Sequence, residues 1–364
     1  MNKKIKICFI SRSAYPLFNP ICKATFGGAE VDLYTIANSL SEDSLFDVTF
    51  IVGDFEQKSV EKVGNIQLFK SYRFEENKLL QMFKLIVKII KLDADFYIQE
   101  GASGGTGIIS LVCKIINKKF IYRTASDIDC NGDFIKNNFV EGIFYKWGLF
   151  HASKIITQNE SNKKQLKDIF NLNSVVIRNG MKIPKILKND RNTILWIARS
   201  EKLKQPFIFL EIAKEFSKEK FIMICPEANF NSVDVTELRK KASEITNLTF
   251  IQSVPFVDIN NYYCNAKIFI NTSIYEGFPN TFVQSAINAV PIITLNVDPD
   301  NFLQKYKNGF CAHGNFSKII SEIKRILNSQ NEWTNMSINA YNYALNNNDI
   351  NKIILEYKKI FTKM

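Results

Sequence analysis

Histidine is the scarcest residue of catalytic and metal chemistry here: the 364-residue chain has only two, His151 and His313. Two histidines so far apart in sequence argue against a histidine-based metal site or a serine–histidine triad. The seven cysteines are odd in number and never spaced as C-x-x-C, which predicts reduced thiols and no zinc site. We therefore expect neither a metal nor a cofactor.

Long apolar runs are also missing. No stretch approaches the roughly 18 uninterrupted apolar residues of a membrane-spanning helix, and residues 1–9 lack the core of a signal peptide. These absences predict a cytoplasmic protein. Proline and glycine are few, and 46% of the residues are hydrophobic, so the chain is expected to be folded. Its length favours two domains.

The formal net charge is +11, which favours an anionic partner: nucleic acid, an acidic lipid or a phosphorylated small molecule. The lysines are spread along the chain, and no helix-turn-helix, zinc-finger or RNP pattern is present. We therefore expect no nucleic acid among its partners.

Short apolar runs recur along the first half and alternate with segments of helical period. The run at residues 5–10 is typical of a strand buried on both faces. A loop containing Gly27-Gly28 follows it, and a helix is predicted over residues 29–40. This order of elements predicts a doubly wound α/β sheet. Further strands are predicted at residues 48–52, 96–98, 120–122 and 154–157.

The second half repeats this alternation after a polar stretch around residues 183–191. We place a linker at 184–192, between domains at 1–183 and 193–345. Two Rossmann-like domains are thus predicted, with the carboxyl ends of their strands at a common cleft, where open α/β sheets bind ligands. Strands of the second domain are predicted at residues 194–198, 221–225, 248–252, 268–271 and 291–295.

Two loops that follow predicted strands carry groups able to hold an anion. Gly27-Gly28 would let a diphosphate approach the backbone at a helix start, although an isolated glycine pair is more often an ordinary turn. Arg199 and Lys204 follow the strand at 194–198 and offer a forked guanidinium and a point charge. Two such cations, taken alone, are more often solvated surface groups.

A third loop begins after the strand that ends near Asn271. Pro279 suits the first turn of a helix, so Glu276 is expected in the preceding loop and Gln284 inside the helix. Both side chains can then point into one cleft. A carboxylate near a helix start is as often a capping group, so both interpretations stay open.

Taken in order, these motifs resemble glycosyltransferase family 4, whose members are retaining enzymes of the GT-B fold. Each motif alone is weak, but the ordered set spans nearly the whole chain. The resemblance implies an α/β GT-B fold with two Rossmann-like, doubly wound domains facing a central cleft. The motifs are Gly27-Gly28-Ala29-Glu30, Ile177-Arg178-Asn179-Gly180-Met181, Ala198-Arg199 with Lys204, and Glu276-Gly277-Phe278-Pro279 with Ala286 and Pro291-Ile292-Ile293.

The resemblance also implies what each part does. Residues 1–183 are expected to bind the acceptor and residues 193–345 the nucleotide sugar, with a helix in 346–364 packing back on the first domain. Gly27 and Gly28 look like the loop that the diphosphate approaches.

Within the second domain, Arg199 and Lys204 look like the diphosphate-binding pair. Glu276 looks like the first glutamate of an E-x7-E motif, set against the donor sugar. The same segment is expected to line the donor site with Gly277, Phe278, Pro279, Asn280 and Thr281.

Two positions depart from the family pattern. The second glutamate, which commonly holds the ribose, falls at Gln284, whose neutral amide makes weaker hydrogen bonds than a carboxylate. The family's histidine beside the reacting sugar has no counterpart, and Asp127 is a candidate for orienting sugar hydroxyls, with a turn-capping role as an equal alternative. Asp127-Ile128-Asp129 matches the D-x-D pattern of metal-dependent transferases, but 93–95 and 298–300 match it too.

The implied activity is metal-independent transfer of a sugar, for example a hexose, from a UDP- or GDP-sugar to a glycan or lipid-linked acceptor in surface polysaccharide synthesis. Two alternatives stay open at this point. One is a nucleotide-sugar epimerase of the same fold. The other is a non-catalytic nucleotide-sugar-binding partner of an active transferase.

Two stretches, 77–91 and 134–150, predict basic amphipathic helices with unusually wide apolar arcs. Such an arc suits packing within a domain, or peripheral contact with an anionic membrane. Membrane contact would place the protein at the inner face of the plasma membrane. The narrow polar face of the first stretch consists of Asn77, Gln81, Lys84, Lys88 and Lys91.

Overall fold

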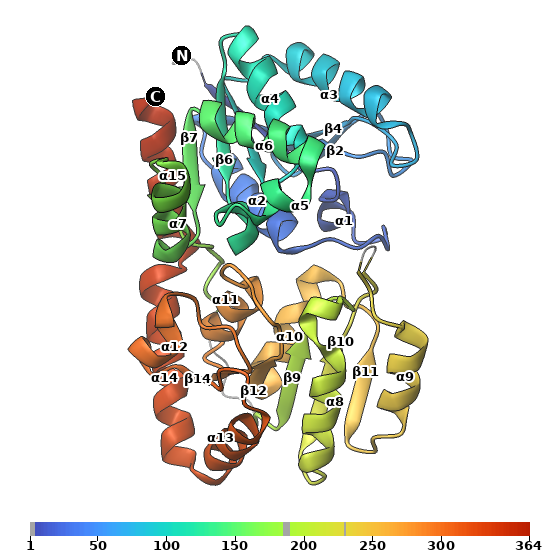
Figure 1. The fold of residues 1–364 in the computed structure, drawn as a ribbon, viewed down its shortest axis with the longest axis vertical. Helices are drawn as coiled ribbons and strands as arrows, with labels where there is room; N and C mark the ends of the chain where they lie inside the picture. Colours follow the sequence, from blue (N-terminus) through green and yellow to red (C-terminus); the bar gives the residue numbers. More distant parts are fainter. Residues whose placement is uncertain (1–3, 185–189, 229–230) are drawn as a thin grey trace. The chain divides into compact units, whose positions relative to one another are not determined.

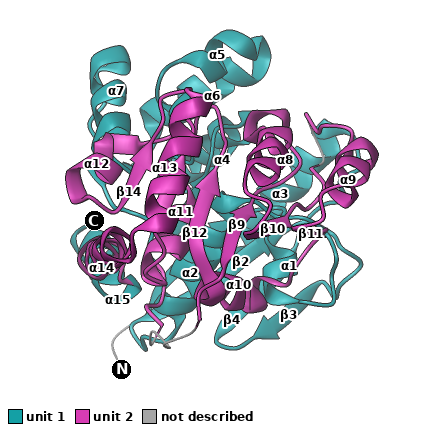
Figure 2. Cartoon of the chain, turned by 90° about the horizontal axis from the view of Figure 1, so that it is seen from below, with its two compact units in different colours: residues 1–180, 350–364 teal, residues 181–349 magenta. Residues whose placement is uncertain are grey.

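The structure is a computed structural model that describes residues 4–184, 190–228 and 231–364. It divides into two compact units, coloured separately in Figure 2. Unit 1 comprises Met1–Gly180 and Ile350–Met364, and unit 2 comprises Met181–Asp349. The divisions thus fall at Gly180 and Asp349, where the sequence suggested residues 183 and 345. Residues 185–189 of the predicted linker lie outside the described residues.

Unit 1 contains an eight-stranded sheet in the order β3-β4-β2-β1-β5-β6-β7-β8 (Figure 1). Its described strand pairs are parallel except β3 with β4. The strands are β1 (Ile5–Ile10), β2 (Phe46–Val52), β3 (Val60–Val63), β4 (Ile66–Lys70), β5 (Phe96–Glu100), β6 (Lys119–Arg123), β7 (Lys154–Thr157) and β8 (Val175–Val176). The helices are α1 (Tyr15–Phe18), α2 (Gly28–Ser41), α3 (Lys78–Leu92), α4 (Gly104–Ile115), the 3-10 turn η1 (Asp127–Asp129), α5 (Asp133–Asn137), α6 (Phe139–His151), α7 (Glu160–Phe170) and α15 (Ile350–Lys363).

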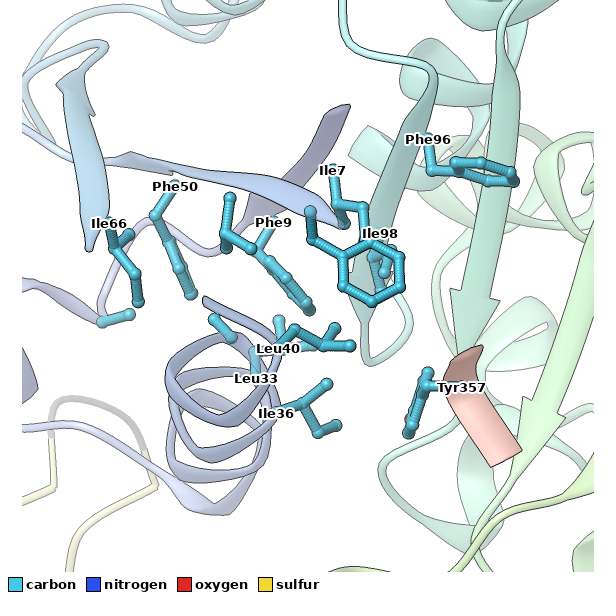
Figure 3. Close-up of a cluster of buried hydrophobic side chains, with 14 of the residues drawn as sticks. Ile7, Phe9, Leu33, Ile36, Leu40, Phe50, Ile66, Phe96, Ile98 and Tyr357 are labelled. Atoms are coloured by element: carbon cyan, nitrogen blue, oxygen red, sulfur yellow. The ribbon is translucent and has the colours of Figure 1, made fainter. Parts of the chain in front are cut away.

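The central strand β1 is apolar on both faces because both faces of the sheet are covered. Side chains alternate along a strand, so Ile7 and Phe9 face one layer while Cys8 and Ile10 face the other. On the first face, α2 contributes Leu33, Ile36 and Leu40, which lie against the strand side chains in Figure 3. Because both faces of β1 are buried, its sequence is almost wholly apolar.

The last helix, α15, belongs to the same core as β1. Five of its side chains are buried there, and Phe361 makes edge contacts with Phe46 and Phe96, with ring centroids 5.8 and 5.0 Å apart. Figure 3 shows Tyr357 beside the α2 layer. Unit 1 is therefore completed by the end of the chain. The five side chains are Ile350, Ile353, Ile354, Tyr357 and Phe361.

The second face of the sheet in unit 1 carries α3, α4, α6 and α7, whose buried side chains share a cluster with Cys8 and Ile10. Helices α4 and α6 approach at their glycines. A Cβ added to Gly107 would lie 2.2 Å from the Phe144 carbonyl oxygen, and one added to Gly148 would lie 2.7 Å from the Gly107 nitrogen. The two backbones therefore touch where no side chain intervenes.

The sequence suggested one helix over residues 134–150, and this prediction is wrong in one respect. The structure has two helices, α5 and α6, separated at Asn138, whose φ of −133° and ψ of 80° are not helical. The break lets Gly142 pack on the backbone of Ile135, since an added Cβ would lie 2.7 Å from the Ile135 oxygen. The chain therefore turns back on itself here.

Unit 2 contains a six-stranded, all-parallel sheet in the order β11-β10-β9-β12-β13-β14. Numbered within the unit, this order is 3-2-1-4-5-6, that of the dinucleotide-binding Rossmann fold. The strands are β9 (Thr193–Ile197), β10 (Lys220–Ile224), β11 (Leu248–Ile251), β12 (Ala266–Asn271), β13 (Ile292–Thr294) and β14 (Gly309–Cys311). The helices are η2 (Lys202–Lys204), α8 (Pro206–Glu215), α9 (Val235–Ser243), η3 (Phe256–Asp258), α10 (Ile259–Asn265), α11 (Asn280–Ile287), η4 (Pro299–Asn301), α12 (Phe302–Tyr306), α13 (Phe316–Asn328) and α14 (Gln330–Asn347).

Two layers of helices also cover the sheet of unit 2. Trp196 of β9 stacks against Phe209 of α8 at 5.9 Å on one side. On the other, Phe269 of β12 lies 5.6 Å from Tyr263 of α10 and 6.4 Å from Phe282 of α11. Both sheets are thus three-layered and doubly wound, which confirms the fold class predicted from the sequence.

Four short strands escaped the sequence prediction: β3, β4, β8 and β14. β3 is mostly exposed, β8 has two residues and β14 has three, so the side chains of these three strands carry little apolar pattern. In the part of the chain that the structure describes, no helix is long and apolar enough to cross a membrane.

Candidate donor site in unit 2

The carboxyl ends of β9 and β12 lie side by side at the point where the strand order of unit 2 reverses. In open parallel sheets this switch point is where ligands bind, because the loops of the two strands diverge there. Arg199 and Lys204 follow β9, and Glu276 follows β12. The three charged residues singled out in the sequence therefore follow the two strands that flank the switch point.

Lys204 and Glu276 form an ion pair at the switch point, with 2.7 Å between Nζ and Oε2. Each side chain is only 16% exposed. The other carboxylate oxygen, Oε1, accepts hydrogen bonds from Asn271 Nδ2 at 3.0 Å and from Ser273 Oγ at 2.6 Å. The loop after β12 thus supplies two neutral donors to a carboxylate that a lysine neutralises.

These partners fix the ionisation state of Glu276. Burial disfavours the carboxylate, but the charge and hydrogen bond of Lys204, with the bonds from Ser273 and Asn271, outweigh it and lower the pKa of Glu276. A carboxylate offers about four lone-pair positions, and three are occupied here. The fourth can accept a hydroxyl group.

The loop after β9 is tied to the loop after β12 through backbone groups. Thr272 Oγ1 donates to the Lys204 carbonyl at 2.6 Å and accepts from Trp196 Nε1 at 2.9 Å. The Ile274 N–H donates to the Leu203 carbonyl at 3.0 Å. Lys204 therefore sits on a backbone fixed by the neighbouring strand, so the pairing does not rely on flexible side chains alone.

Arg199 lies outside this pair. Its Nη2 is 2.6 Å from Oε1 of Glu201, and its side chain is 38% exposed. An ion pair that is partly open to solvent is weaker than a buried one, and its cation can exchange one anion for another. The predicted pair Arg199 and Lys204 thus comprises one exchangeable cation and one that is held in place by Glu276.

Helix α11 begins at Asn280, with Pro279 in an extended conformation at the N-cap (φ −61°, ψ 132°). The prediction that Pro279 lies in the first helical turn is therefore wrong by one residue, because helix starts are the least certain part of a sequence reading. Glu276 lies in the preceding loop, as expected. Gln284 lies inside the helix, 8% exposed, and accepts a hydrogen bond from Tyr263 Oη at 3.3 Å.

The remaining predicted donor-site residues fall into two groups. Gly277, Phe278 and Pro279 are buried, and Phe278 contacts Phe302 of α12, with ring centroids 5.1 Å apart. Asn280 and Thr281 are half-buried at the start of α11. Phe278 therefore anchors the loop in the core, whereas Asn280 and Thr281 are accessible from the helix N-terminus.

In unit 1 the glycine loop precedes α2, which begins at Gly28 with Gly27 at its N-cap. The Glu30 carboxylate lies at this helix start. It accepts hydrogen bonds from the Gly27 N–H at 2.8 Å and from Ser11 Oγ at 3.4 Å. The anion-attracting end of α2 thus already holds a carboxylate from its own chain. Gly28 is exposed and Gly27 half-buried.

Asp127 opens the 3-10 turn η1 after β6. Its Oδ1 accepts a hydrogen bond from Asn162 Nδ2 at 2.7 Å, and its carbonyl accepts from the Cys130 N–H at 2.9 Å. The side chain is half-buried. It belongs to unit 1, as do Gly27 and Gly28, whereas the other predicted site residues belong to unit 2.

Arg123, four residues before Asp127, is fully buried at the end of β6. Its Nη2 donates to Asn179 Oδ1 at 2.6 Å and its Nε to Tyr357 Oη at 3.0 Å, and Nη1 lies 3.5 Å from Glu100 Oε1. Asn179 lies just before the chain leaves unit 1, and Tyr357 lies in α15. One guanidinium therefore ties both segments to the sheet.

Glu100 sits at the switch point of unit 1, at the end of β5, which neighbours β1. Burial raises the pKa of Glu100 well above its ordinary value, against the effect of Arg123, and the nearby carboxyl of Asp32 raises it further. One cation faces two carboxyl groups, so a proton on one of them makes the buried cluster neutral. Gln158 Nε2 donates to Glu100 Oε1 at 2.9 Å.

Sequence reasoning missed several of these residues. Asn271, Ser273 and Thr272 stood at the end of a predicted strand, and their polar character within an apolar run was the available signal. Glu30 follows Gly27 at the spacing of a capping box, which is also readable from sequence. Among the described residues, no group of three or more His, Cys, Asp or Glu side chains is arranged to hold a metal ion.

Comparison with known proteins agrees with this geometry. Residues 191–329 match the family model described as "Glycosyl transferases group 1". An uncharacterised glycosyltransferase of Methanocaldococcus jannaschii is 26% identical over 280 residues, which cover 64% of this chain and 65% of that protein. The chain thus matches less than two thirds of this relative's length.

Two solved structures superpose on nearly the whole chain. Sucrose-phosphate synthase of Thermosynechococcus elongatus superposes with a TM-score of 0.78 and 13% identity, covering 99% of each chain. A glycosyltransferase of Rickettsia africae gives 0.74 and 15%, covering 99% of this chain and 98% of that one. The chain therefore has the GT-B fold. Its matches are of the group 1 glycosyltransferase type, and they favour neither the epimerase nor the non-catalytic alternative.

Proposed function

We propose that this chain is a retaining glycosyltransferase of family 4, which moves a hexose or related sugar from a nucleoside diphosphate sugar to a glycan or lipid-linked acceptor. The observation that carries the proposal is the Lys204–Glu276 pair at the switch point of unit 2. The matched segment, residues 191–329, contains both residues. A role in surface polysaccharide synthesis is part of this proposal.

The cations of unit 2 suit a leaving nucleoside diphosphate. When the bond from the anomeric carbon to the phosphate oxygen breaks, the diphosphate keeps the electron pair and its negative charge grows. Lys204 has three N–H donors and gives one to Glu276, so two remain for phosphate oxygens. Arg199 exchanges Glu201 for the diphosphate. No metal is needed to neutralise the charge in this scheme.

Glu276 orients the sugar. Its lowered pKa keeps it ionised at neutral pH, and its free lone-pair position accepts a hydroxyl of the donor sugar. Asn271 and Ser273 keep the carboxylate in one orientation. In this scheme the acceptor oxygen bonds to the face that the diphosphate leaves, so the configuration is retained, and the leaving phosphate oxygen takes the acceptor proton.

The remaining predicted residues take secondary roles. Gln284 binds the ribose through its amide more weakly than a glutamate would. In unit 1, Gly27 and Gly28 meet the diphosphate only if Glu30 yields its hydrogen bond from Gly27, and Asp127 orients a sugar hydroxyl.

Thermal unfolding in the presence of UDP, GDP, ADP and their sugars tests the donor site. A ligand at 100 times its Kd stabilises the native state by about 2.7 kcal/mol, so one nucleotide is expected to raise the Tm of the wild-type chain. Arg199→Ala and Lys204→Ala are each expected to weaken that nucleotide about tenfold. Glu276→Gln is expected to keep binding and lose transfer by at least about 100-fold.

Lys214→Ala is the matched control, because Lys214 is an exposed lysine of α8 that pairs only with Glu211 among the contacts described. It should bind nucleotide as the wild type does. If no nucleotide or nucleotide sugar raises the Tm of the wild-type chain, the donor-site proposal is wrong.

A further inference from the structure

Three neighbouring helices of unit 1 leave much apolar surface uncovered. Helix α3 packs on α4, and α4 packs on α6. Leu79 of α3, Ile115 of α4 and Phe139 of α6 are 73%, 73% and 81% exposed. Monomeric proteins rarely expose contiguous apolar patches of this kind without a use for them. The exposed apolar side chains on these helices are Leu79, Leu80, Phe83, Ile90, Leu111, Ile115, Phe139, Val140, Ile143, Phe144 and Phe150.

The core covers only a part of the wide apolar arc of helix α3. Only Leu85 and Ile89 are buried along its 15 residues. At about 100° per residue, Leu79, Phe83 and Ile90 fall within roughly 40° of one another, about 120° around the helix from those two. The protein interior therefore covers one side of the apolar arc, and the other side is an uncovered apolar stripe.

Lysines border the uncovered stripe of α3. Lys84, Lys88 and Lys91 fall on one strip of the helix, between the exposed stripe and the core. Lys84 pairs with Glu76 and Lys88 lies over the Phe69 ring, whereas Lys91 is exposed. Across α3, α4 and α6 there are six lysines and a single acidic residue, Glu141. The six lysines are Lys78, Lys84, Lys88, Lys91, Lys114 and Lys146.

Side-chain contacts join the three helices into one surface, here called the α3–α4–α6 surface. Lys78 of α3 pairs with Glu141 of α6 at 2.7 Å. Lys114 of α4 lies over the Trp147 ring of α6, 5.9 Å from its centroid. Helices α4 and α6 also touch through Gly107 and Gly148. The exposed side chains are therefore held on a rigid support.

We infer that the α3–α4–α6 surface binds the surface of an anionic lipid bilayer. Apolar side chains next to a row of lysines fit acyl chains below a layer of negative headgroups. A second copy of the chain is a poor occupant, because face-to-face pairing would bring two lysine rows together. The inference concerns attachment and does not depend on the proposed transfer activity.

Vesicle co-sedimentation of the full chain, without nucleotide, tests this inference. Vesicles of phosphatidylcholine alone are compared with vesicles containing about 30% phosphatidylglycerol. The wild-type chain is expected to bind the anionic vesicles at least tenfold more tightly, and high salt should weaken this binding. Phe83→Ser with Phe139→Ser and Ile143→Ser is expected to reduce binding at least tenfold.

The matched control is Ile338→Ser with Leu355→Ser, two apolar residues 52% and 55% exposed elsewhere on the chain. It should bind as the wild type does. The replaced residues are all exposed, so circular dichroism and Tm should stay unchanged, and the single variant Phe139→Ser serves if the triple variant unfolds. Equal binding to both vesicle types, no binding, or a wild-type dimer that the triple variant converts to a monomer would overturn the inference.

Discussion

In each unit, a glutamate beside the switch point of a parallel sheet meets a basic side chain that lies at or after the end of a neighbouring strand. In unit 2, Glu276 and Lys204 are 2.7 Å apart, each 16% exposed, and two neutral donors hold the carboxylate. In unit 1, Glu100 and Arg123 are 3.5 Å apart with no exposed side-chain surface.

The consequence for ionisation is opposite in the two units. The pKa of Glu276 is lowered, because Lys204, Ser273 and Asn271 outweigh burial. The pKa of Glu100 is raised, because burial and a second carboxyl, Asp32, outweigh Arg123. The glutamate beside the switch point is thus partly exposed with a lowered pKa in unit 2, whereas in unit 1 it is buried with a raised pKa. Access to solvent and the number of hydrogen-bond donors around each glutamate decide whether its pKa is lowered or raised.

The largest expected effect comes from breaking the unit 1 cluster. Arg123→Ala leaves Glu100, Asn179 and Tyr357 without their common donor inside the core, and should lower the free energy of unfolding of unit 1 by about 3–5 kcal/mol. Urea unfolding, with hydrogen exchange to separate the units, measures it. Lys204→Ala should cost clearly less, because Glu276 keeps Asn271 and Ser273. Equal losses in the two variants would contradict the contrast.

The pH dependence of stability should differ in sign between the two glutamates. A raised folded pKa means that Glu100 stabilises the native state below its ordinary pKa of 4.5 and that this contribution is lost as pH rises. A lowered folded pKa means that Glu276 contributes above 4.5 and loses this contribution as pH falls.

The measurement is the free energy of unfolding of Glu100→Gln and Glu276→Gln, relative to wild type, between pH 3 and 9. The free energy of unfolding of the wild type minus that of the variant should fall with rising pH for Glu100→Gln. For Glu276→Gln the same quantity should fall with falling pH. Each change amounts to at most about 1.4 kcal/mol per pH unit. Parallel curves for the two variants would show that the two sites titrate alike.

The smallest expected effects come from removing single hydroxyl groups. Tyr357→Phe deletes the hydrogen bond from Arg123 Nε and should cost about 1 kcal/mol of stability in unit 1 without changing nucleotide binding. Ser273→Ala deletes one donor to Glu276 and should raise the pKa of that carboxyl. Unfolding curves measure the first effect, and a pH profile of sugar transfer measures the second. A change of nucleotide affinity in Tyr357→Phe would contradict the separation between the buried cluster of unit 1 and the proposed donor site of unit 2.

Much of the fold could be predicted because its central strands are buried on both faces. The run at 5–10 is apolar apart from Lys6, the run at 154–157 has two isoleucines at its centre, and they became β1 and β7 with the predicted bounds. The short edge strands β3 and β8 could not be predicted, because partial exposure removes the apolar pattern on which the prediction depends.

The candidate site was predictable only in part. Arg199 and Arg123 look alike in sequence, since each follows an apolar run, yet Arg199 is half-buried and Arg123 is fully buried. Partners distant in sequence make the difference, and Tyr357 is 234 positions away from Arg123. The local sequence pattern therefore identified the loops, but it did not show which of the two arginines would be accessible to a ligand. Similarly, the capping of Gly27 by Glu30 changes what the glycine loop offers.

Helix α15 makes unit 1 discontinuous, and this has a consequence for how the chain is made. Synthesis runs from the amino terminus, and domains usually fold in that order as they emerge. Here the first unit lacks Ile350, Ile353, Tyr357 and Phe361 until the whole of unit 2 has been synthesised, whereas unit 2 is one continuous stretch. The later-synthesised unit can thus fold first, and the apolar side chains of unit 1 that pack on α15 stay uncovered until α15 is made.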